Sequence, residues 1–121
     1  MVPKIAKLWL TQDYVKRLLD YDQDSGLFRW RGNHAGKPAG SIAGSLRGDF
    51  AFVTLHGALV PYPDLAWLWM MGQFPDDDST IVHIDGNTLR NAWSNLRLVR
   101  NSKLGKIWVL HLHRRAQAPP A

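Results

Sequence analysis

Apolar and polar side chains alternate in short blocks along the first half of the chain, and each block predicts a short element. Apolar residues at helical spacing follow Thr11, a residue type that suits a helix N-cap, and predict a helix over residues 12–21. In residues 27–31, Phe28 and Trp30 alternate with Arg29 and Arg31, which predicts a half-buried strand with one basic face. The glycine-rich stretch that follows predicts tight turns and short strands of a small sheet.

A hairpin and a second short helix are predicted in the middle of the chain. Residues 50–62 have the pattern of two strands joined by a turn at His56 and Gly57. Residues 64–72 have the length of a short buried helix, with Asp64 suited to its N-cap and a glycine at its end. Its large apolar side chains are predicted to lie in the core: Trp67, Trp69, Met70 and Met71.

A strand, a turn, a second strand and a helix are predicted in the last third. The β-branched run "TIVHI" is followed by the turn dipeptide Asp85-Gly86, and "NLRLV" is a second short strand. Apolar residues then recur at helical spacing over residues 104–112. The elements together predict an α+β fold, with a small N-terminal helix and antiparallel strands followed by a hairpin and a C-terminal helix.

Length and composition are those of one compact domain, because 121 residues with 45% hydrophobic side chains hardly suffice for two. Within a single domain over residues 1–121, we expect a helix and small sheet over residues 10–60. A helix plus hairpin module is expected over residues 62–112, and a flexible tail over residues 114–121. No run reaches the length of a membrane span and no signal-peptide cleavage site is visible, so we expect a cytoplasmic protein.

Charge and cysteine content limit the metal sites and the partners that the chain can have. The chain has no cysteine, which excludes disulfides and thiolate metal sites and leaves His, Asp, Asn or carbonyl oxygens as ligands for any metal. Its 15 Lys and Arg outnumber 10 acidic residues and give a formal net charge of +5. Such a charge favours a polyanion such as nucleic acid as partner, although ordinary solubility also accounts for it.

Five segments, taken together and in this order, resemble the HNH endonuclease family, in particular its small phage and intron-encoded members. The matching segments are "LTQDYVKRLLDYDQDSGLFRW", "AGS", "LAWLWMMGQFP", "HIDGN" and "NAWSNLRLV". The resemblance covers residues 10–103, which is most of the chain. It implies a ββα-metal hairpin, in which a strand ends at a histidine, a loop and a second strand follow, and a helix packs across the pair.

The resemblance also implies a role for particular residues of the hairpin. His83 would be the general base that takes a proton from the attacking water, and Asn95 would brace the loop by bonding its backbone. The two metal ligands of the family would fall at Val82 and Leu104, and neither side chain has a lone pair to give. We therefore expect a degenerate site, with no metal and no cofactor.

Two further features of the sequence bear on this expectation. Pro63-Asp64 stands where the family has His-Arg, which removes an imidazole and reverses a charge near the expected DNA face. If a metal were nonetheless bound, Asp85, Asn87 or Asn91 would be its substitute ligands. For Asp85 the turn position favours capping of its own backbone over ligation.

The function predicted from these features is binding rather than catalysis. The chain would be an inactive, repurposed phage or prophage HNH-type protein in a bacterial host cell. It would bind DNA or a host nucleic-acid-processing or defence machine, as an inhibitor or regulator. The alternative is an active DNA nicking endonuclease that uses His83 with Mg²⁺ or Mn²⁺. A third hypothesis, a protein-interaction module without nucleic acid, is suggested by the six tryptophans.

Basic side chains from both halves of the chain are the candidates for a nucleic-acid face. They are Arg29, Arg31, Lys37, Arg47, Arg97, Arg100 and Lys103.

Overall fold

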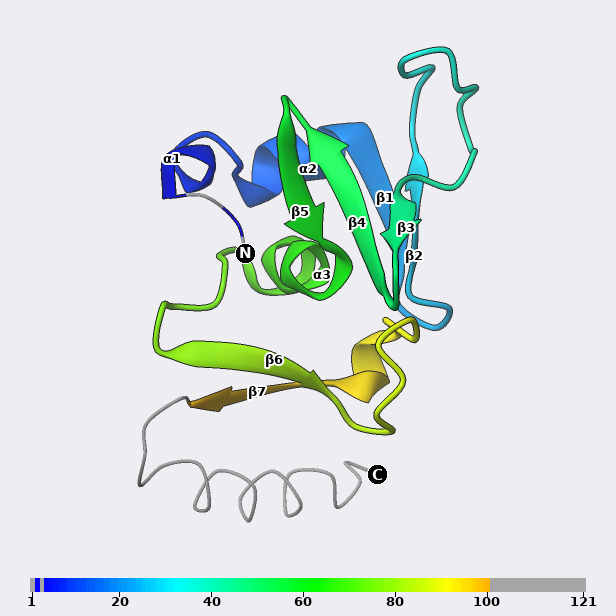
Figure 1. Cartoon of the computed structure of the whole chain (residues 1–121). Coiled ribbons are helices and arrows are strands. Elements are labelled where there is room, and N and C mark those ends of the chain that lie inside the picture. Colours follow the sequence, from blue (N-terminus) through cyan, green and yellow to red (C-terminus); the bar gives the residue numbers. More distant parts are fainter. Residues whose placement is uncertain (1, 3, 101–121) are drawn as a thin grey trace.

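The structure is a computed structural model that describes residue 2 and residues 4–100 (Figure 1). In chain order its elements are α1 (Lys4–Lys7), α2 (Gln12–Leu18), β1 (Leu19–Asp22), β2 (Leu27–Trp30), β3 (Ser45–Arg47), β4 (Phe50–Leu55), β5 (Ala58–Pro61), α3 (Tyr62–Met71), β6 (Ser79–His83), the 3₁₀ turn η1 (Trp93–Asn95) and β7 (Leu96–Arg100). All strand pairs are antiparallel and form the sheets β1-β2, β3-β4-β5 and β6-β7. The fold is therefore α+β, as the sequence predicts.

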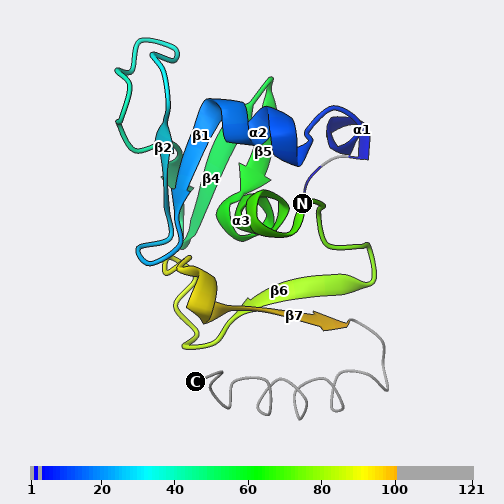
Figure 2. The same ribbon diagram turned by 180° about the vertical axis from the view of Figure 1, so that it is seen from behind.

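The layers of the fold meet at α3. Figure 1 shows α3 between the three-stranded sheet and the β6–β7 hairpin, and the view from behind in Figure 2 shows the same order. One core cluster contains buried side chains from both halves of the chain: Val15 of α2, Phe28 of β2, Val53 of β4, Leu65 of α3 and Leu96 of β7. The hairpin therefore packs on the same core as the N-terminal elements. None of the described helices is long and apolar enough to cross a membrane.

The helix predicted over residues 12–21 is shorter in the structure, because its last residues belong to β1. Thr11 caps it as expected, because its hydroxyl accepts from the N–H of Tyr14, but the helix ends at Leu18. The next four residues form β1, in which Leu19 and Tyr21 are buried and alternate with exposed aspartates. Pairing with β2 in register Leu19↔Trp30 outweighs the helical spacing of the local sequence.

The hairpin predicted in the middle of the chain is confirmed. β4 and β5 are joined by His56 and Gly57, with φ of 48° and 80°. Two consecutive positive φ values are those of a type I′ turn, whose twist matches that of the strands it joins. The glycine-rich stretch before it contains β3, which pairs with β4.

The prediction for α3 is right about its end and wrong about its start and its buried face. Gly72 ends the helix with a φ of 91°, but Pro61 occupies the N-cap without a side-chain bond, and Asp64 lies in the first turn. Fully buried residues of the helix are Tyr62, Leu65, Ala66 and Leu68, whereas Trp67, Trp69 and Met70 are half-buried and Met71 is 57% exposed. A helix apolar on all sides does not tell which side faces the core.

Tryptophans outside α3 are mostly covered as well. Trp30 is buried and Trp93 is half-buried, while Trp9 is 37% exposed beside the exposed Ile5 and Leu8. Trp108 lies outside the described residues.

The turn between β1 and β2 fixes the hairpin loop to the rest of the protein. Gly26 has a φ of 78°, and a Cβ placed on it would lie 2.2 Å from the carbonyl carbon of Asn91. On either side of this contact, the N–H of Trp93 donates to the carbonyl of Gln23 (2.9 Å), and the Tyr21 hydroxyl donates to the carbonyl of Asn91 (2.5 Å). These two hydrogen bonds thus hold the main chain of residues 91–93 against Gly26, where a side chain would not fit.

We expect Gly26→Ala to lower the free energy of unfolding by about 2 kcal/mol or more, because the methyl group meets main chain that cannot move aside. Gly86→Ala is the matched control, since Gly86 has the same φ of 78° and nothing within 4 Å of its Cβ position. Its expected cost is roughly 1 kcal/mol of backbone strain alone. Urea unfolding of both variants measures the difference, and equal losses would show that the turn does not dock tightly.

Candidate functional site in the β6–β7 hairpin

The hairpin is a two-stranded ladder with a long, structured loop. His83 is the last residue of β6 and lies opposite Leu96, the first residue of β7, which is buried. Residues 84–95 connect the two strands and include η1. The helix predicted over residues 104–112 lies outside the described residues, as do Lys103 and Leu104, so the structure tests only the two strands of the predicted ββα arrangement.

His83 is half-buried and makes one side-chain hydrogen bond among the described residues. Its Nε2 lies 2.8 Å from Oδ1 of Asn91, a residue only 2% exposed. An amide oxygen can only accept, so this bond requires a proton on Nε2, and in the neutral form of the ring the lone pair is then on Nδ1. Asn91 therefore fixes the tautomer of His83.

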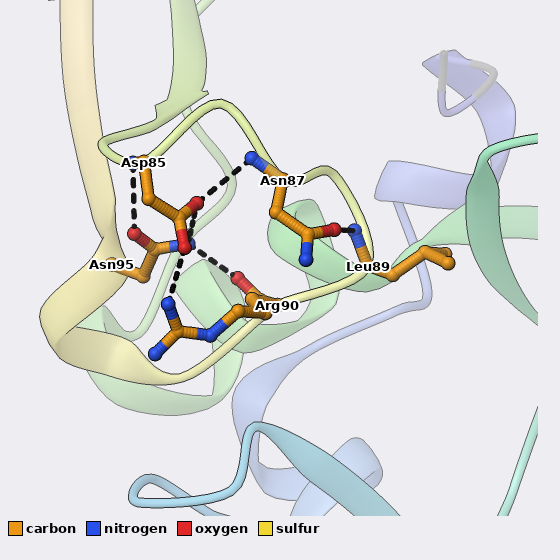
Figure 3. Close-up of polar contacts among 5 residues, drawn as sticks. All are labelled: Asp85, Asn87, Leu89, Arg90 and Asn95. Carbon is orange, nitrogen blue, oxygen red and sulfur yellow. Dashed lines mark hydrogen bonds and ion pairs between the residues drawn. The ribbon is translucent and has the colours of Figure 1, made fainter.

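Asn95 joins the two ends of the loop (Figure 3). Its Oδ1 accepts from the N–H of Asp85 (3.1 Å), and its Nδ2 donates to the carbonyl of Arg90 (2.8 Å) and to Oδ1 of Asp85 (3.0 Å). Its carbonyl accepts from the N–H of Ile84 (2.9 Å). At 6% exposure, Asn95 has these polar groups bonded inside the protein rather than to water.

Asp85 is occupied by the same network. Its Oδ1 also accepts from the N–H of Asn87 (2.8 Å), and its Oδ2 pairs with the Arg90 guanidinium. The bond from Asn87, followed by those from Asn95 and Arg90, lowers the pKa of Asp85 below its usual value. The carboxylate is an ionised turn cap, which is the role that its position in the sequence favours.

The described residues do not fit a divalent cation at this place. Val82 holds the position before His83 and offers no lone pair. The oxygens of the three substitute ligands are engaged: Asp85 as described above, Asn87 by the N–H of Leu89 (3.0 Å) and Asn91 by His83. Within residues 2 and 4–100, no three His, Cys, Asp or Glu side chains gather as a metal site would require.

Sequence reasoning missed two partners in this loop. The sequence indicates Asn91 only as a substitute metal ligand, and it indicates no role for Arg90. Asn91, which bonds His83, lies against the β1–β2 turn, and the sequence around residue 91 does not predict this contact between distant segments. Arg90 lies five residues after Asp85, and in a loop that contains glycine this spacing does not predict an ion pair.

The predicted basic residues form two groups. Arg29 and Arg31 belong to β2 and the loop after it, which also carries Lys37. Arg29 donates to the carbonyl of Gly40 (3.0 Å) and Arg31 pairs with Asp20 (2.7 Å). Figures 1 and 2 both place the loop between β2 and β3 at the opposite end of the molecule from the β6–β7 hairpin.

The second group lies at the hairpin. Arg97 and Arg100 are residues of β7. Arg47 ends β3, and the turn that follows it contacts the hairpin loop, because the Thr88 hydroxyl donates to the carbonyl of Asp49. We call Arg47, Arg97 and Arg100 the hairpin arginines.

Asp64 lines a cleft together with Val82 and His83. Burial raises the pKa of this carboxyl above its usual value. A partly desolvated acid therefore lies in the same cleft as the histidine.

We expect Asn95→Ala to lower the free energy of unfolding by roughly 2–4 kcal/mol, because several buried groups lose their partners at about 1–3 kcal/mol each. Asn87→Ala is the matched control, since Asn87 is an exposed asparagine of the same loop with only a local bond, and its expected effect is at most about 1 kcal/mol. Chemical unfolding of the two variants tests this. Similar losses would mean that Asn95 does not hold the loop together.

Comparison with known proteins gives one match. The family model described as HNH endonuclease matches residues 64–106, which run from the first turn of α3 through β7 to just beyond the described residues. No curated protein and no solved structure matches the chain. The similarity to the HNH endonuclease family thus lies in the segment that contains α3 and the β6–β7 hairpin.

Proposed function

We propose that the protein is a nucleic-acid-binding member of the HNH endonuclease family that does not cleave phosphodiester bonds. The observation that carries the proposal is the pair His83 and Val82: the base of the family is retained beside a residue that cannot bind a metal. The side-chain oxygens of Asp85, Asn87 and Asn91 support the same proposal, because each residue already accepts a hydrogen bond.

Magnitudes favour binding over catalysis. A positioned general base contributes roughly 10²–10⁴-fold to a reaction rate. Enzymes typically accelerate their reactions by about 10⁶-fold or more, and phosphate esters are among the slowest substrates. His83 alone, without a group that stabilises the charge on the leaving oxygen, falls short of that enhancement.

Nucleic acid is the partner that the charge favours. The net charge of +5 and the hairpin arginines would attract phosphates without reading the base sequence. We further propose that the protein is of phage or prophage origin, acts in the cytoplasm of a bacterial host, and inhibits or regulates a host nucleic-acid-processing or defence machine. That part rests on the combination of a retained family framework with a lost metal ligand.

A second candidate function, metal-dependent nicking of DNA, is favoured by the geometry of His83. Because Asn91 holds the proton on Nε2, the lone pair on Nδ1 remains available to a water molecule. An active enzyme would therefore find its base already in the correct tautomer.

We expect no nicking of supercoiled plasmid by the purified protein with Mg²⁺ or Mn²⁺, because Val82 and Leu104 replace the two ligands. The assay compares the parent with His83→Ala, which removes the base. Nicking by the parent that His83→Ala abolishes would establish the active nuclease instead. Nicking that persists in His83→Ala would identify a contaminant and leave the expected result in place.

We expect weak binding of duplex DNA that depends steeply on salt, with log K falling by about 0.9 per unit of log salt for each phosphate contact. The double variant Arg47→Ala with Arg100→Ala should reduce that slope by up to about 1.8. Arg17→Ala is the control, because Arg17 is an exposed arginine of α2 that pairs with Asp13. Absence of DNA affinity even at low salt would overturn the nucleic-acid proposal and favour a protein partner.

A further inference from the structure

A cleft of about 640 Å³ runs beside β6, and its volume lies in the range of ligand-binding clefts. All five residues of β6 line it, including neighbours whose side chains point to opposite faces of the strand. A groove lined in this way follows the edge of a strand rather than one face of a sheet. The other walls come from β4, the end of β5, the first turn of α3, the loop after α3, residues 2 and 7 near the N-terminus, and the hairpin loop.

The edge of β6 that faces away from β7 carries backbone groups outside the ladder. In an antiparallel pair, residues alternate between those that exchange ladder bonds and those that turn their N–H and C=O outward. The N–H of Ile84 donates to the carbonyl of Asn95, and the same register continues as His83↔Leu96. Val82 therefore bonds Arg97, while Ile81 and His83 turn outward.

Other bonds agree with this assignment. Ser79 lies two residues before Ile81, so its backbone groups also turn away from β7. Its N–H donates to the carbonyl of Asp76 (3.1 Å), outside the ladder. The outward carbonyl of His83 accepts from the N–H of Gly86 (3.0 Å). Within the described residues, the N–H groups of Ile81 and His83 and the carbonyl of Ile81 have no such partner.

Side chains of the cleft select a particular kind of occupant. Phe50, which is 54% exposed, and Phe74 offer apolar surface. Three carboxylates line the cleft against one lysine: Asp64, Asp76, Asp77 and Lys7, the last two 3.6 Å apart. An occupant should therefore combine apolar side chains with positive charge, and a phosphate backbone would meet like charges.

We propose that this cleft binds an extended peptide segment of a partner protein, which adds a strand to the outer edge of β6 and brings basic side chains to the carboxylates. Main-chain bonds to Ile81 and His83 would supply affinity, and the two-residue period of a strand would alternate apolar with basic side chains. This site is distinct from the nucleic-acid contact proposed above and goes beyond that function.

The probe is the peptide acetyl-Lys-Val-Lys-Val-Lys-Val-Lys-amide, compared with the same peptide carrying Glu in place of every Lys. Both are titrated to millimolar concentration into the ¹⁵N-labelled full chain, and amide resonances and hydrogen exchange are followed by NMR. The lysine peptide should shift the amides of Ile81 and His83 and slow exchange at Ile81. The glutamate peptide should bind roughly tenfold more weakly. Val82, whose N–H is in the ladder, should be protected with and without peptide.

Asp64→Asn tests the charge contribution, with Asp13→Asn on α2 as the matched control outside the cleft. Because burial raises the pKa of Asp64, the folded protein holds this charge at a cost, and the variant should be at least as stable as the parent at neutral pH. A loss of lysine-peptide affinity in Asp64→Asn but not in Asp13→Asn is expected. Equal affinities in the two variants would remove Asp64 from the site.

Three outcomes would overturn the proposal. The first is an Ile81 amide already protected from exchange in the free chain, since the edge would then be covered. The second is the absence of shifts at Ile81 and His83 with the lysine peptide. The third is a short DNA duplex that shifts these same amides, which would assign the cleft to nucleic acid.

Discussion

The contact between the β1–β2 turn and the main chain of residues 91–93 is the constraint on which the candidate site depends. Gly26 allows the two backbones to meet, and the bonds Trp93–Gln23 and Tyr21–Asn91 hold them there. The buried amide of Asn91 is thereby directed at His83. The tautomer of the histidine thus depends partly on residues that precede the segment matching the family. Residues 64–106 alone therefore do not determine the geometry around His83.

The hairpin loop, in contrast, is stabilised from within. Asn95, Asp85 and Arg90 satisfy one another and the backbone around them, through hydrogen bonds and the Asp85–Arg90 ion pair. A loop built this way keeps its shape when a metal ligand is replaced by valine. The shape of the loop, and with it the position of His83 at the end of β6, therefore depends on these protein groups.

Local chemistry could be predicted from the sequence, whereas contacts between distant segments could not. The Thr11 cap, the His56-Gly57 turn and the Gly72 end of α3 each depend on a few adjacent residues, and each was predicted correctly. The helix that ends at Leu18 instead of residue 21 was not, because β2 draws the following residues into a strand. Asn91, which bonds His83, contacts the same β1–β2 unit, so the local sequence does not predict this bond either.

Electrostatics distinguish the cleft beside His83 from a site for phosphate chemistry. A nuclease must bring a polyanion to its base, and carboxylates serve there when a bound cation neutralises them. Here Val82 offers no lone pair to a cation, and Asp64 adds an acid to the same cleft. The raised pKa of Asp64 reflects a charge held in partly desolvated surroundings, which a cationic group would stabilise. The acidic cleft and the hairpin arginines therefore suit partners of opposite charge, with His83 lining the cleft between α3 and β6.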